Sequence, residues 1–369
     1  MIPRINALAN AAHLQVLFVA GRELTYTRNN VLLRALRRQE YSLDVIGVLQ
    51  PVSSISRTSA QLLPELVKRL SKRRYDVIVV GFYGYLLAPV VTAFTRTPLL
   101  FDAFVSNYDT LCFDRKVVAP DSFAGQVLYQ FDKRVCRRAR HLLLDTPQHI
   151  AYFVDTFGLN AQRVSWLPVG CNEDIFHPRP ASPYQAATNV LHYSTFLPLH
   201  GVDVILRAAA HLRAAPVSFR LIGDGPLRPA MMALARELNL SNVEFLPPVS
   251  LTALSEEIGK AHVCLGGHFG ASGKAQRVVP GKIYQMMASQ RAIIAADSPA
   301  NRTLLTHEVS ALLVQPEDPE QLAAAILRLH EDQNLREVLA FNTQRTFQSQ
   351  CSEQVISTRL ASIISTLPE

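Results

Sequence analysis

The feature that most limits the fold is a regular alternation of short apolar strands, glycine turns and helices from residue 191 to residue 330. Strands that alternate with helices pair in parallel through right-handed crossovers, because each helix returns the chain to the same edge of the sheet. The pattern therefore predicts a doubly wound α/β domain. Its predicted strands are 190–193, 219–222, 243–245, 263–265, 293–295 and 312–314.

The first half repeats this alternation. Its predicted strands are 14–20, 43–48, 77–80, 99–101 and 142–144, and its predicted helices are about 30–38, 59–73 and 124–138. The stretch 77–94 carries no charged residue and is nearly as long as a membrane span. Because Gly81, Gly84 and Pro89 interrupt it, we predict a buried strand and a short helix there instead.

Length and composition favour two domains. A chain of 369 residues, of which 49% are hydrophobic and 18% charged, is long enough for two buried cores. Proline and turn-forming residues at 168–180 indicate a linker. The predicted parts are a first domain at 1–168, a linker at 169–188, a second domain at 189–345, and a final helix within 346–369 that packs back on the first domain. The predicted fold class is α/β, with two Rossmann-like domains facing across a cleft.

The net charge of +7 favours a negatively charged partner, such as a sugar nucleotide or an anionic membrane face. No nucleic-acid recognition motif accompanies the basic residues, so nucleic acid is not expected as a partner. Two basic runs, 68–74 and 133–140, fit either the solvated ends of helices or a patch apposed to a membrane. Both interpretations stay open at this stage.

The cysteines and histidines show no metal-ligand spacing. The five cysteines are scattered, and residues 1–12 lack the charged start and long apolar core of a signal peptide, so a cytoplasmic protein without disulfides or metal is expected. Histidines without mutual ligand spacing are interpreted as structural. These are His141, His149, His211, His262 and His307.

Two glycine turns each end a predicted strand and precede a helix. Such a turn presents backbone N–H groups, and the helix dipole adds to their attraction for phosphate. The first turn contains Gly21, and the second contains Gly223, Asp224 and Gly225. A tight turn before a helix that starts at Pro226 explains the second turn equally well.

The order of segments 221–226, 242–247, 282–288 and 313–319 resembles the nucleotide-sugar-binding half of the retaining "group one" glycosyltransferases, and 167–178 is similar to their interdomain segment. The resemblance implies the GT-B fold, with the donor held by the second domain and the acceptor by the first. It also implies transfer of a hexose from a UDP- or GDP-sugar, with retention of configuration and no metal or other cofactor. The implied acceptor is lipid-linked, a polysaccharide or another acceptor, at the inner membrane face, as in cell-envelope polysaccharide synthesis.

The chain departs from the family at the positions that hold the donor. The family's diphosphate-binding arginine and lysine would fall near Ser194 and at His200, and its Glu-x7-Glu pair would fall near Arg277 and Gln285 if no gap is allowed. We prefer an alignment in which Gly267-His268-Phe269-Gly270 matches the family's Glu-x-Phe-Gly turn, with extra residues before Gln285.

In this alignment a basic segment replaces the missing cations. We hypothesise that Lys274 and Arg277 hold the diphosphate, because a guanidinium can bind phosphate through two parallel hydrogen bonds. Gln285 would then bind the ribose without a charge. The alternative is a solvated basic turn. The other expected donor-site residues are Gly21, His200, Gly223, Asp224, Gly225, Phe269, Gly270 and Lys282.

In the first domain, Asp102 falls where the family has a sugar-contacting histidine. Its carboxylate would hold a sugar hydroxyl or stabilise oxocarbenium-like charge, and capping the following turn is the alternative. Weaker candidates in the same loop are Asn107, Tyr108, Asp109 and Arg115. Arg22 or Arg28 would meet an anionic acceptor, with a helix start capped by Asn29 or Asn30 as the plainer explanation.

Two other functions are the alternatives to transfer. One is a non-catalytic nucleotide-sugar-binding or scaffold subunit, which the missing glutamates and cations favour. The other is a sugar-nucleotide epimerase of GT-B fold, which should carry carboxylates and histidines in the cleft suited to elimination, and the sequence does not reveal such a set.

Overall fold

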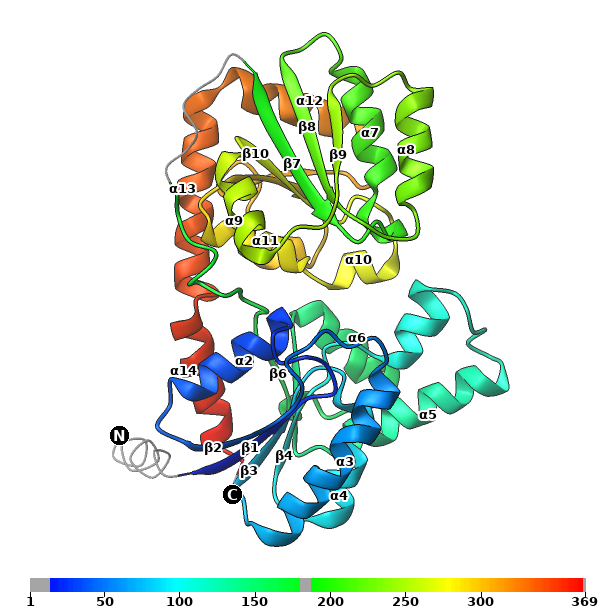
Figure 1. Ribbon diagram of the computed structural model, residues 1–369, viewed down its shortest axis with the longest axis vertical. Coiled ribbons are helices and arrows are strands. Elements are labelled where there is room, and N and C mark those ends of the chain that lie inside the picture. Colours follow the sequence, from blue (N-terminus) through cyan, green and yellow to red (C-terminus); the bar gives the residue numbers. More distant parts are fainter. Residues whose placement is uncertain (1–13, 180–186, 368–369) are drawn as a thin grey trace. The chain divides into compact units, whose positions relative to one another are not determined.

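The computed structural model describes residues 14–179 and 187–367, and the chain forms two compact units (Figure 1). Unit 1 comprises 1–170 and 353–369, and unit 2 comprises 171–352. The chain returns from unit 2 to unit 1 at residue 353, beyond the expected 345/346 boundary, because helix α13 (Gln333–Gln350) continues past that boundary. Residues 180–186 of the expected linker, 1–13 of the first expected domain and 368–369 of the last lie outside the described residues.

Unit 1 is built on a six-stranded sheet in which all pairs are parallel, in the order β2-β1-β3-β4-β5-β6. The strands are β1 (Gln15–Val19), β2 (Ser42–Ile46), β3 (Val77–Val80), β4 (Leu99–Asp102), β5 (His141–Leu144) and β6 (Val164–Trp166). The sequence pattern missed β6, because only one of its three residues is buried and so short a strand has no periodicity to detect.

Helices cover both faces of this sheet (Figure 1). They are α2 (Thr27–Arg37), α3 (Ile55–Lys72), α4 (Ala88–Phe94), α5 (Phe123–Arg138), α6 (Pro147–Phe157) and α14 (Glu353–Ser365). Successive strand side chains point to opposite faces. Leu17 and Val19 therefore join the core under α3 to α6, while Val16 and Phe18 join the core under α2 and α14. The buried carboxylate of Glu353 pairs with Arg34 and Arg38 and ties α14 to α2.

The apolar stretch 77–94 forms β3, a short 3₁₀ turn and α4, as predicted. Among the described residues no helix is both long and apolar enough to cross a membrane.

Unit 2 contains a second parallel sheet of six strands, in the order β12-β11-β10-β7-β8-β9. The strands are β7 (Thr188–Ser194), β8 (Val217–Gly223), β9 (Val243–Leu246), β10 (Val263–Gly267), β11 (Ala292–Ala296) and β12 (Leu312–Val314). The helices between them are α7 (Val202–His211), α8 (Arg228–Glu237), α9 (Leu251–Lys260), α10 (Gly273–Arg277), α11 (Gly281–Ala288) and α12 (Pro319–Glu331). The prediction of two doubly wound α/β domains is confirmed.

The strand orders identify where each sheet can hold a ligand. In unit 2 the first strand, β7, lies between β8 and β10, so the winding changes direction between β7 and β10. In unit 1 the corresponding point lies between β1 and β3. Ligands of open α/β sheets bind outside the carboxyl ends of the strands at such a switch point. The functional site is therefore expected beyond Ser194 and Gly267 in unit 2.

Candidate functional site

Four basic side chains gather at the switch point of unit 2. His192 lies on β7, His200 ends the 3₁₀ turn that follows β7, His268 comes directly after β10, and Lys282 lies in the first turn of α11. The ring centroids of His200 and His268 are 5.4 Å apart. The charge of Lys282 lowers the pKa of all three histidines, so the four residues interact electrostatically. We call these four residues the cationic cluster.

Three polar atoms of the cationic cluster are buried without a hydrogen-bond partner among the described residues. They are Nε2 of His192, Nδ1 of His268 and Nζ of Lys282. A buried polar group left in this state costs about 1 to 3 kcal/mol, so such groups mark places where a ligand can supply the missing partner.

His200 supplies a further donor. Its Nδ1 accepts a hydrogen bond from the backbone N–H of Leu197 at 3.1 Å, so in the neutral ring the hydrogen is on Nε2. In His192 the arrangement is the reverse, because Nδ1 donates to the carbonyl of Leu265 at 3.1 Å. Backbone contacts therefore fix the tautomers of both rings.

Burial is the main cause of the pKa shifts in the cluster. It lowers the pKa of Lys282 to about 7 and that of His268 to about 3, and it also lowers the pKa values of His192 and His200. Among the described residues no carboxylate contributes to any of these shifts. A bound anion would raise all four pKa values and would satisfy the charge that the protein leaves uncompensated.

Lys282 lies beside a glycine. A Cβ atom added at Gly267 would lie 3.9 Å from Nζ of Lys282 and make no closer contact than that. The carbonyl of Gly267 accepts a hydrogen bond at 3.3 Å from the side chain of Asn301, which also donates to Ala296 at 2.8 Å. Asn301 thus ties the end of β10 to the end of β11 and holds the turn next to Lys282.

Gln285 lies one turn after Lys282 on α11 and is buried. Its Oε1 accepts a hydrogen bond from the hydroxyl of Tyr193 at 2.7 Å, and the same hydroxyl lies 3.3 Å from the carbonyl of Lys282. Tyr193 is on β7, so it fixes the orientation of the Gln285 amide and positions α11 against the switch point. The ribose-binding role of Gln285 stays a prediction.

The glycines of the second turn are explained by packing. A Cβ at Gly223 would lie 1.9 Å from the carbonyl oxygen of Ser194, and one at Gly225 would lie 1.8 Å from that of Thr195. Asp224 is exposed, and its carboxylate accepts from the N–H of Gly225 at 2.8 Å. The turn after β8 therefore requires glycine in order to approach the end of β7, whether or not it also binds phosphate.

Phe269 and Gly270 make packing contacts within unit 2. The side chain of Phe269 is fully buried in the core of unit 2 and does not face a ligand. A Cβ at Gly270 would lie 2.6 Å from the carbonyl oxygen of Pro198, and one at Gly201 would lie 2.6 Å from the nitrogen of Gly270. The two glycines interlock the turn after β7 with the turn after β10, and this contact positions His200 near His268.

The structure places Lys274 and Arg277 on α10, the short helix after this turn. Ser272 caps α10 through the N–H of Ala275, and the N–H of Ala300 donates to the carbonyl of Gln276 at 3.2 Å. Lys274 lowers the pKa of His268, so it lies at the edge of the cationic cluster. The role of Lys274 and Arg277 toward a diphosphate stays a prediction.

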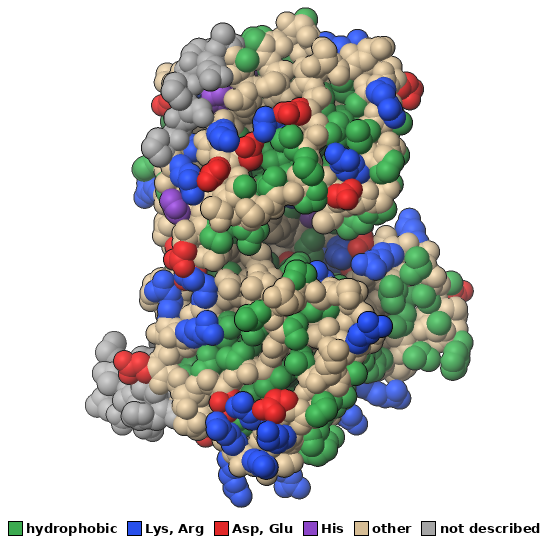
Figure 2. Space-filling view, viewed as in Figure 1, with side chains coloured by type: hydrophobic (Ala, Val, Ile, Leu, Met, Phe, Trp, Pro, Cys, Tyr) green, Lys and Arg blue, Asp and Glu red, His purple; other side chains and the backbone are tan. Residues whose placement is uncertain are grey.

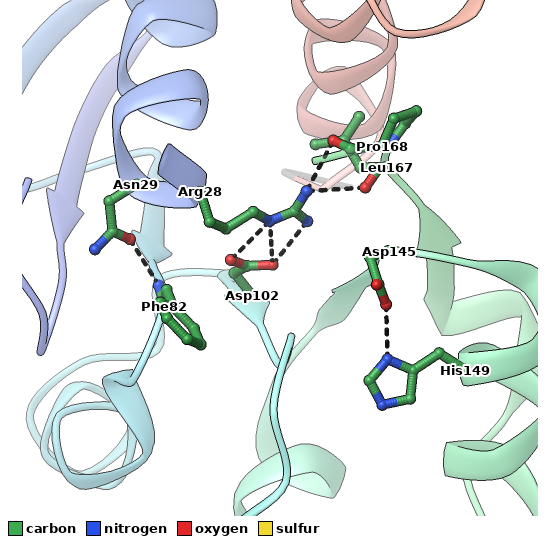
Figure 3. Close-up of polar contacts among 8 residues, drawn as sticks. All are labelled: Arg28, Asn29, Phe82, Asp102, Asp145, His149, Leu167 and Pro168. Atoms are coloured by element: carbon green, nitrogen blue, oxygen red, sulfur yellow. Dashed lines mark hydrogen bonds and ion pairs between the residues drawn. The ribbon is translucent and has the colours of Figure 1, made fainter. Parts of the chain in front are cut away.

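In unit 1 the residues expected to meet a sugar and an acceptor pair with each other instead (Figure 3). The guanidinium of Arg28 donates to both carboxylate oxygens of Asp102, at 2.8 to 3.1 Å, and to the carbonyls of Leu167 and Pro168, both at 2.9 Å. Both side chains are fully buried. The carboxylate of Asp102 is therefore occupied by Arg28 rather than by a helix N–H, and Arg28 is not exposed to an acceptor.

Asn29 also differs from its expected role as a cap. Helix α2 begins at Thr27, so Asn29 lies inside its first turn. Its Oδ1 accepts from the N–H of Phe82 at 2.9 Å, and its Nδ2 donates to the carbonyls of Arg22 and Glu23, both at 3.2 Å. Figure 3 shows that it joins α2 to the loop after β3. Asn30 does not cap the helix either.

A buried pair that the sequence did not reveal lies at the carboxyl end of β5. Nδ1 of His149 is 2.7 Å from Oδ1 of Asp145 (Figure 3). The only sequence signal is an aspartate directly after a strand and a histidine four residues later in the next helix, which is too common to identify a site. The interpretation of His149 as structural stays a prediction.

The remaining candidate site residues of unit 1 lie in the turn after β1 or in the loop after β4. A Cβ at Gly21 would lie 2.2 Å from the carbonyl oxygen of Tyr83, so close packing requires this glycine. Arg22 keeps 30% of its side chain exposed, and its guanidinium lies 4.7 Å from the ring centroid of Tyr26. Asp132 accepts hydrogen bonds from Asn107 and from the N–H of Tyr108 and thereby holds the loop after β4. Asp109 is buried in this loop and Arg115 follows it.

The described residues offer no ligand set for a metal ion. Among residues 14–179 and 187–367, no group of three or more His, Cys, Asp and Glu side chains is arranged to hold one. Metal independence stays a prediction.

Comparison with known proteins relates unit 2 to one family. Residues 187–332, which cover most of unit 2, match the family model "Glycosyl transferases group 1". The D-inositol 3-phosphate glycosyltransferase of Thermobispora bispora is 28% identical over 221 residues, which are 54% of this chain and 50% of the relative. The lipopolysaccharide core biosynthesis glycosyltransferase LpsD of Rhizobium meliloti is 25% identical over 232 residues, 58% of this chain and 65% of LpsD. The chain spans about half the length of most of the curated relatives it matches.

Solved structures extend the likeness to the whole chain. Anabaena Alr3699/HepE in complex with UDP-glucose superposes with a TM-score of 0.71 at 16% identity, covering 96% of this chain and 100% of that protein. WaaG, a glycosyltransferase involved in lipopolysaccharide biosynthesis, superposes with a TM-score of 0.66 at 15% identity, covering 95% and 100%. This chain contributes two parallel six-stranded sheets to the superposition. The chain therefore has the GT-B fold, and its residues 187–332 are similar to the group 1 glycosyltransferases.

Proposed function

We propose that this protein is a glycosyltransferase that moves a sugar of the hexose type from a UDP- or GDP-sugar to a glycan or lipid-linked acceptor, with retention of configuration and without a metal ion. The observation that carries the proposal is the cationic cluster at the switch point of unit 2, within the segment that matches the family. The bond between the sugar C1 and the diphosphate breaks, a bond from C1 to an acceptor hydroxyl oxygen forms, and the hydroxyl proton and the nucleoside diphosphate leave.

The donor's diphosphate is assigned to cations of unit 2. Negative charge grows on the leaving diphosphate as the C1–O bond breaks, and fixed positive groups stabilise that charge. Lys274 and Arg277 on α10 are the groups proposed to do this. Gln285, held by Tyr193, is proposed to bind the ribose. The complex of HepE with UDP-glucose supports UDP as the first nucleotide to test.

Unit 1 is proposed to bind the acceptor. Arg22, stacked on Tyr26 and partly exposed, replaces Arg28 as the candidate for an anionic acceptor. Relatives named for colanic acid and lipopolysaccharide core biosynthesis support an acceptor of the cell envelope. We propose a cytoplasmic protein that contacts the inner membrane face.

The first basic run offers modest support for that contact. Arg69 and Arg73 both pair with Asp44, at 2.9 and 2.8 Å, so part of its charge is neutralised within the protein. Figure 2 shows acidic side chains among the basic ones at the end of unit 1 where α3 ends in Figure 1. Lys72 and Arg74 are exposed at the same end, and they are the cations proposed to face lipid.

A non-catalytic nucleotide-sugar-binding or scaffold subunit is the second candidate, because Gly267 and Gln285 stand where the preferred alignment expects the family's two carboxylates. An epimerase of the same fold is the third. Incubation of the protein with a UDP-sugar, with and without a glycan acceptor, distinguishes them. Release of UDP together with a glycosylated acceptor supports transfer, an epimeric donor supports the epimerase, and binding without any product supports the subunit.

The direct test is calorimetric titration of UDP and GDP against the wild type and the double variant Lys274→Ala/Arg277→Ala. Loss of two phosphate-binding cations should weaken binding of the preferred nucleotide by about 2 to 5 kcal/mol. Arg236→Ala is the matched control, because Arg236 is exposed on α8. If neither nucleotide binds the wild type, the proposal fails. If the double variant binds as tightly as the wild type, the assignment of Lys274 and Arg277 is wrong.

A further inference from the structure

We infer that the sugar of the donor carries a carboxylate, so that the substrate is a nucleoside-diphosphate hexuronate whose carboxylate pairs with Nζ of Lys282 beside Gly267. The inference rests on the proposed function and specifies the substrate class of that site.

The environment of Lys282 carries the argument. Its Nζ is buried, has no hydrogen-bond partner among the described residues, and lies 3.9 Å from the position of a Cβ at Gly267. A buried ammonium is retained in proteins when it is paired or when it serves a ligand. A neutral hexose would leave this charge uncompensated, whereas a carboxylate would accept a charge-assisted hydrogen bond from it.

The neighbouring rings favour the same kind of ligand. His200 presents an Nε2–H donor, since its Nδ1 accepts from Leu197. Nδ1 of His268 is buried without a hydrogen-bond partner in the described parts of the chain. A carboxylate has two oxygens with about four acceptor sites, so it can accept from Lys282 and from an imidazole N–H together.

The strand order separates this charge from the glycine turn of unit 2. Gly267 ends β10 and Gly223 ends β8, and β7 lies between these strands. Neighbouring strands lie about 4.8 Å apart, so the two strand ends are separated by about 10 Å. One nucleotide sugar can span that distance, with its phosphates near the turn and the far side of its sugar near Lys282. The ammonium of Lys282 is therefore assigned to the sugar.

The test compares UDP, UDP-glucose and UDP-glucuronate by calorimetric titration of the full chain at pH 6.5. The wild type should bind UDP-glucuronate about 10- to 100-fold more tightly than UDP-glucose, the range expected for one hydrogen-bonded charge pair. In Lys282→Met this preference should disappear, while the affinity for UDP changes less than about twofold. Lys260→Met is the matched control, because Lys260 is an exposed lysine at the end of α9, and it should keep the preference.

Two further variants keep the inference testable if Lys282→Met does not fold. Lys282→Arg retains the charge and should keep a measurable preference for the uronate. Gly267→Glu would place a carboxylate next to Lys282 and should abolish the preference, because the introduced side chain would pair with the ammonium. Apart from the two adjacent residues, no atom comes closer than 3.9 Å to the added Cβ, but the φ of +71° at Gly267 disfavours any residue with a side chain. Circular dichroism therefore checks the fold of this variant before the titration.

The outcomes separate this inference from the proposed function. If UDP binds but the wild type does not prefer the uronate, the inference is overturned and nucleotide binding stands. If Lys282→Met weakens UDP as much as UDP-glucuronate, Lys282 holds the diphosphate and the inference is overturned as well. If UDP itself does not bind, the proposed function fails first.

Discussion

Each unit buries a positive charge near the carboxyl ends of its sheet, and the two charges are treated differently. In unit 1 the guanidinium of Arg28 is surrounded by acceptors, namely both oxygens of Asp102 and the carbonyls of Leu167 and Pro168. In unit 2 the ammonium of Lys282 has histidines as neighbours and no hydrogen-bond partner among the described residues. The first charge is a completed structural element, and the second is suited to bind an anion.

The comparison shows that the type of a charged residue does not reveal whether it stabilises the fold or binds a ligand. The sequence leaves Asp102 and Arg28 open as substrate-binding residues, yet in the structure the two buried side chains are partners of each other. Lys282 is expected only as one of several donor-site residues, yet the described part of the fold provides no carboxylate for its buried charge. Perturbed, uncompensated groups cluster at functional sites, because a stability-optimised fold would pair or remove them.

The largest expected effect on the free energy of unfolding comes from breaking the ion pair of Arg28 with Asp102. Asp102→Asn should leave the guanidinium of Arg28 buried without a countercharge and lower the free energy of unfolding by about 3 to 5 kcal/mol. Urea denaturation followed by circular dichroism measures this change. The double variant Arg28→Met/Asp102→Leu should lose less, because no buried charge remains. A loss below about 1 kcal/mol in Asp102→Asn would show that the pair is not structural.

A smaller effect of opposite sign is expected in unit 2. Lys282→Met removes a buried, uncompensated charge and should raise the free energy of unfolding by about 1 to 3 kcal/mol at pH 6. The pKa of Lys282 is about 7 in the folded protein and about 10.4 in an unfolded chain. Between these values the unfolded state binds more protons, so the stability of the wild type rises with pH. The advantage of the variant should therefore shrink from pH 7 toward pH 10.

Urea denaturation of both proteins at pH 6, 8 and 9.5 tests this sign. Exposed Lys260→Met is the control and should show no such pH-dependent difference. A variant that is less stable than the wild type at pH 6 would mean that Lys282 has a stabilising partner.

The smallest effect concerns the pH dependence of donor binding. An anion binds the charged form of Lys282, and a group with a pKa of about 7 loses roughly nine tenths of its charge by pH 8. The preference for UDP-glucuronate over UDP-glucose should therefore fall about tenfold from pH 6 to pH 8. The groups that face Lys282 are His192, His200, His268 and Tyr193, and burial keeps the pKa values of the three imidazoles below this range.

Calorimetric titration of both donors at pH 6, 7 and 8 measures this change. In Lys282→Arg the decrease should be absent, because a guanidinium stays charged throughout. A preference that does not change between pH 6 and pH 8 in the wild type would contradict a titrating lysine at the site.

The sequence predicted the candidate site only in outline. It identified Lys282, His200 and Gln285 as neighbours of the donor through their order along the chain. It could not identify His192 and His268 as members of the same cluster, because these residues come from β7 and from the turn after β10, which lie far apart along the chain. The ion pair of Arg28 with Asp102 could not be predicted for the same reason, since the two residues are 74 residues apart along the chain.

What the sequence determined by itself is the architecture. Apolar strands, helices with one buried face and glycines at the turns are local properties, and their alternation is sufficient to predict two doubly wound domains. Only the tertiary structure decided which charges are compensated. Pairing depends on which strand ends become neighbours in a sheet, and the order β10-β7-β8 brings together segments whose local sequences carry no information about one another. That order leaves Lys282 without a carboxylate among the described residues. The order of the first sheet instead brings Asp102 to a position where it forms an ion pair with Arg28.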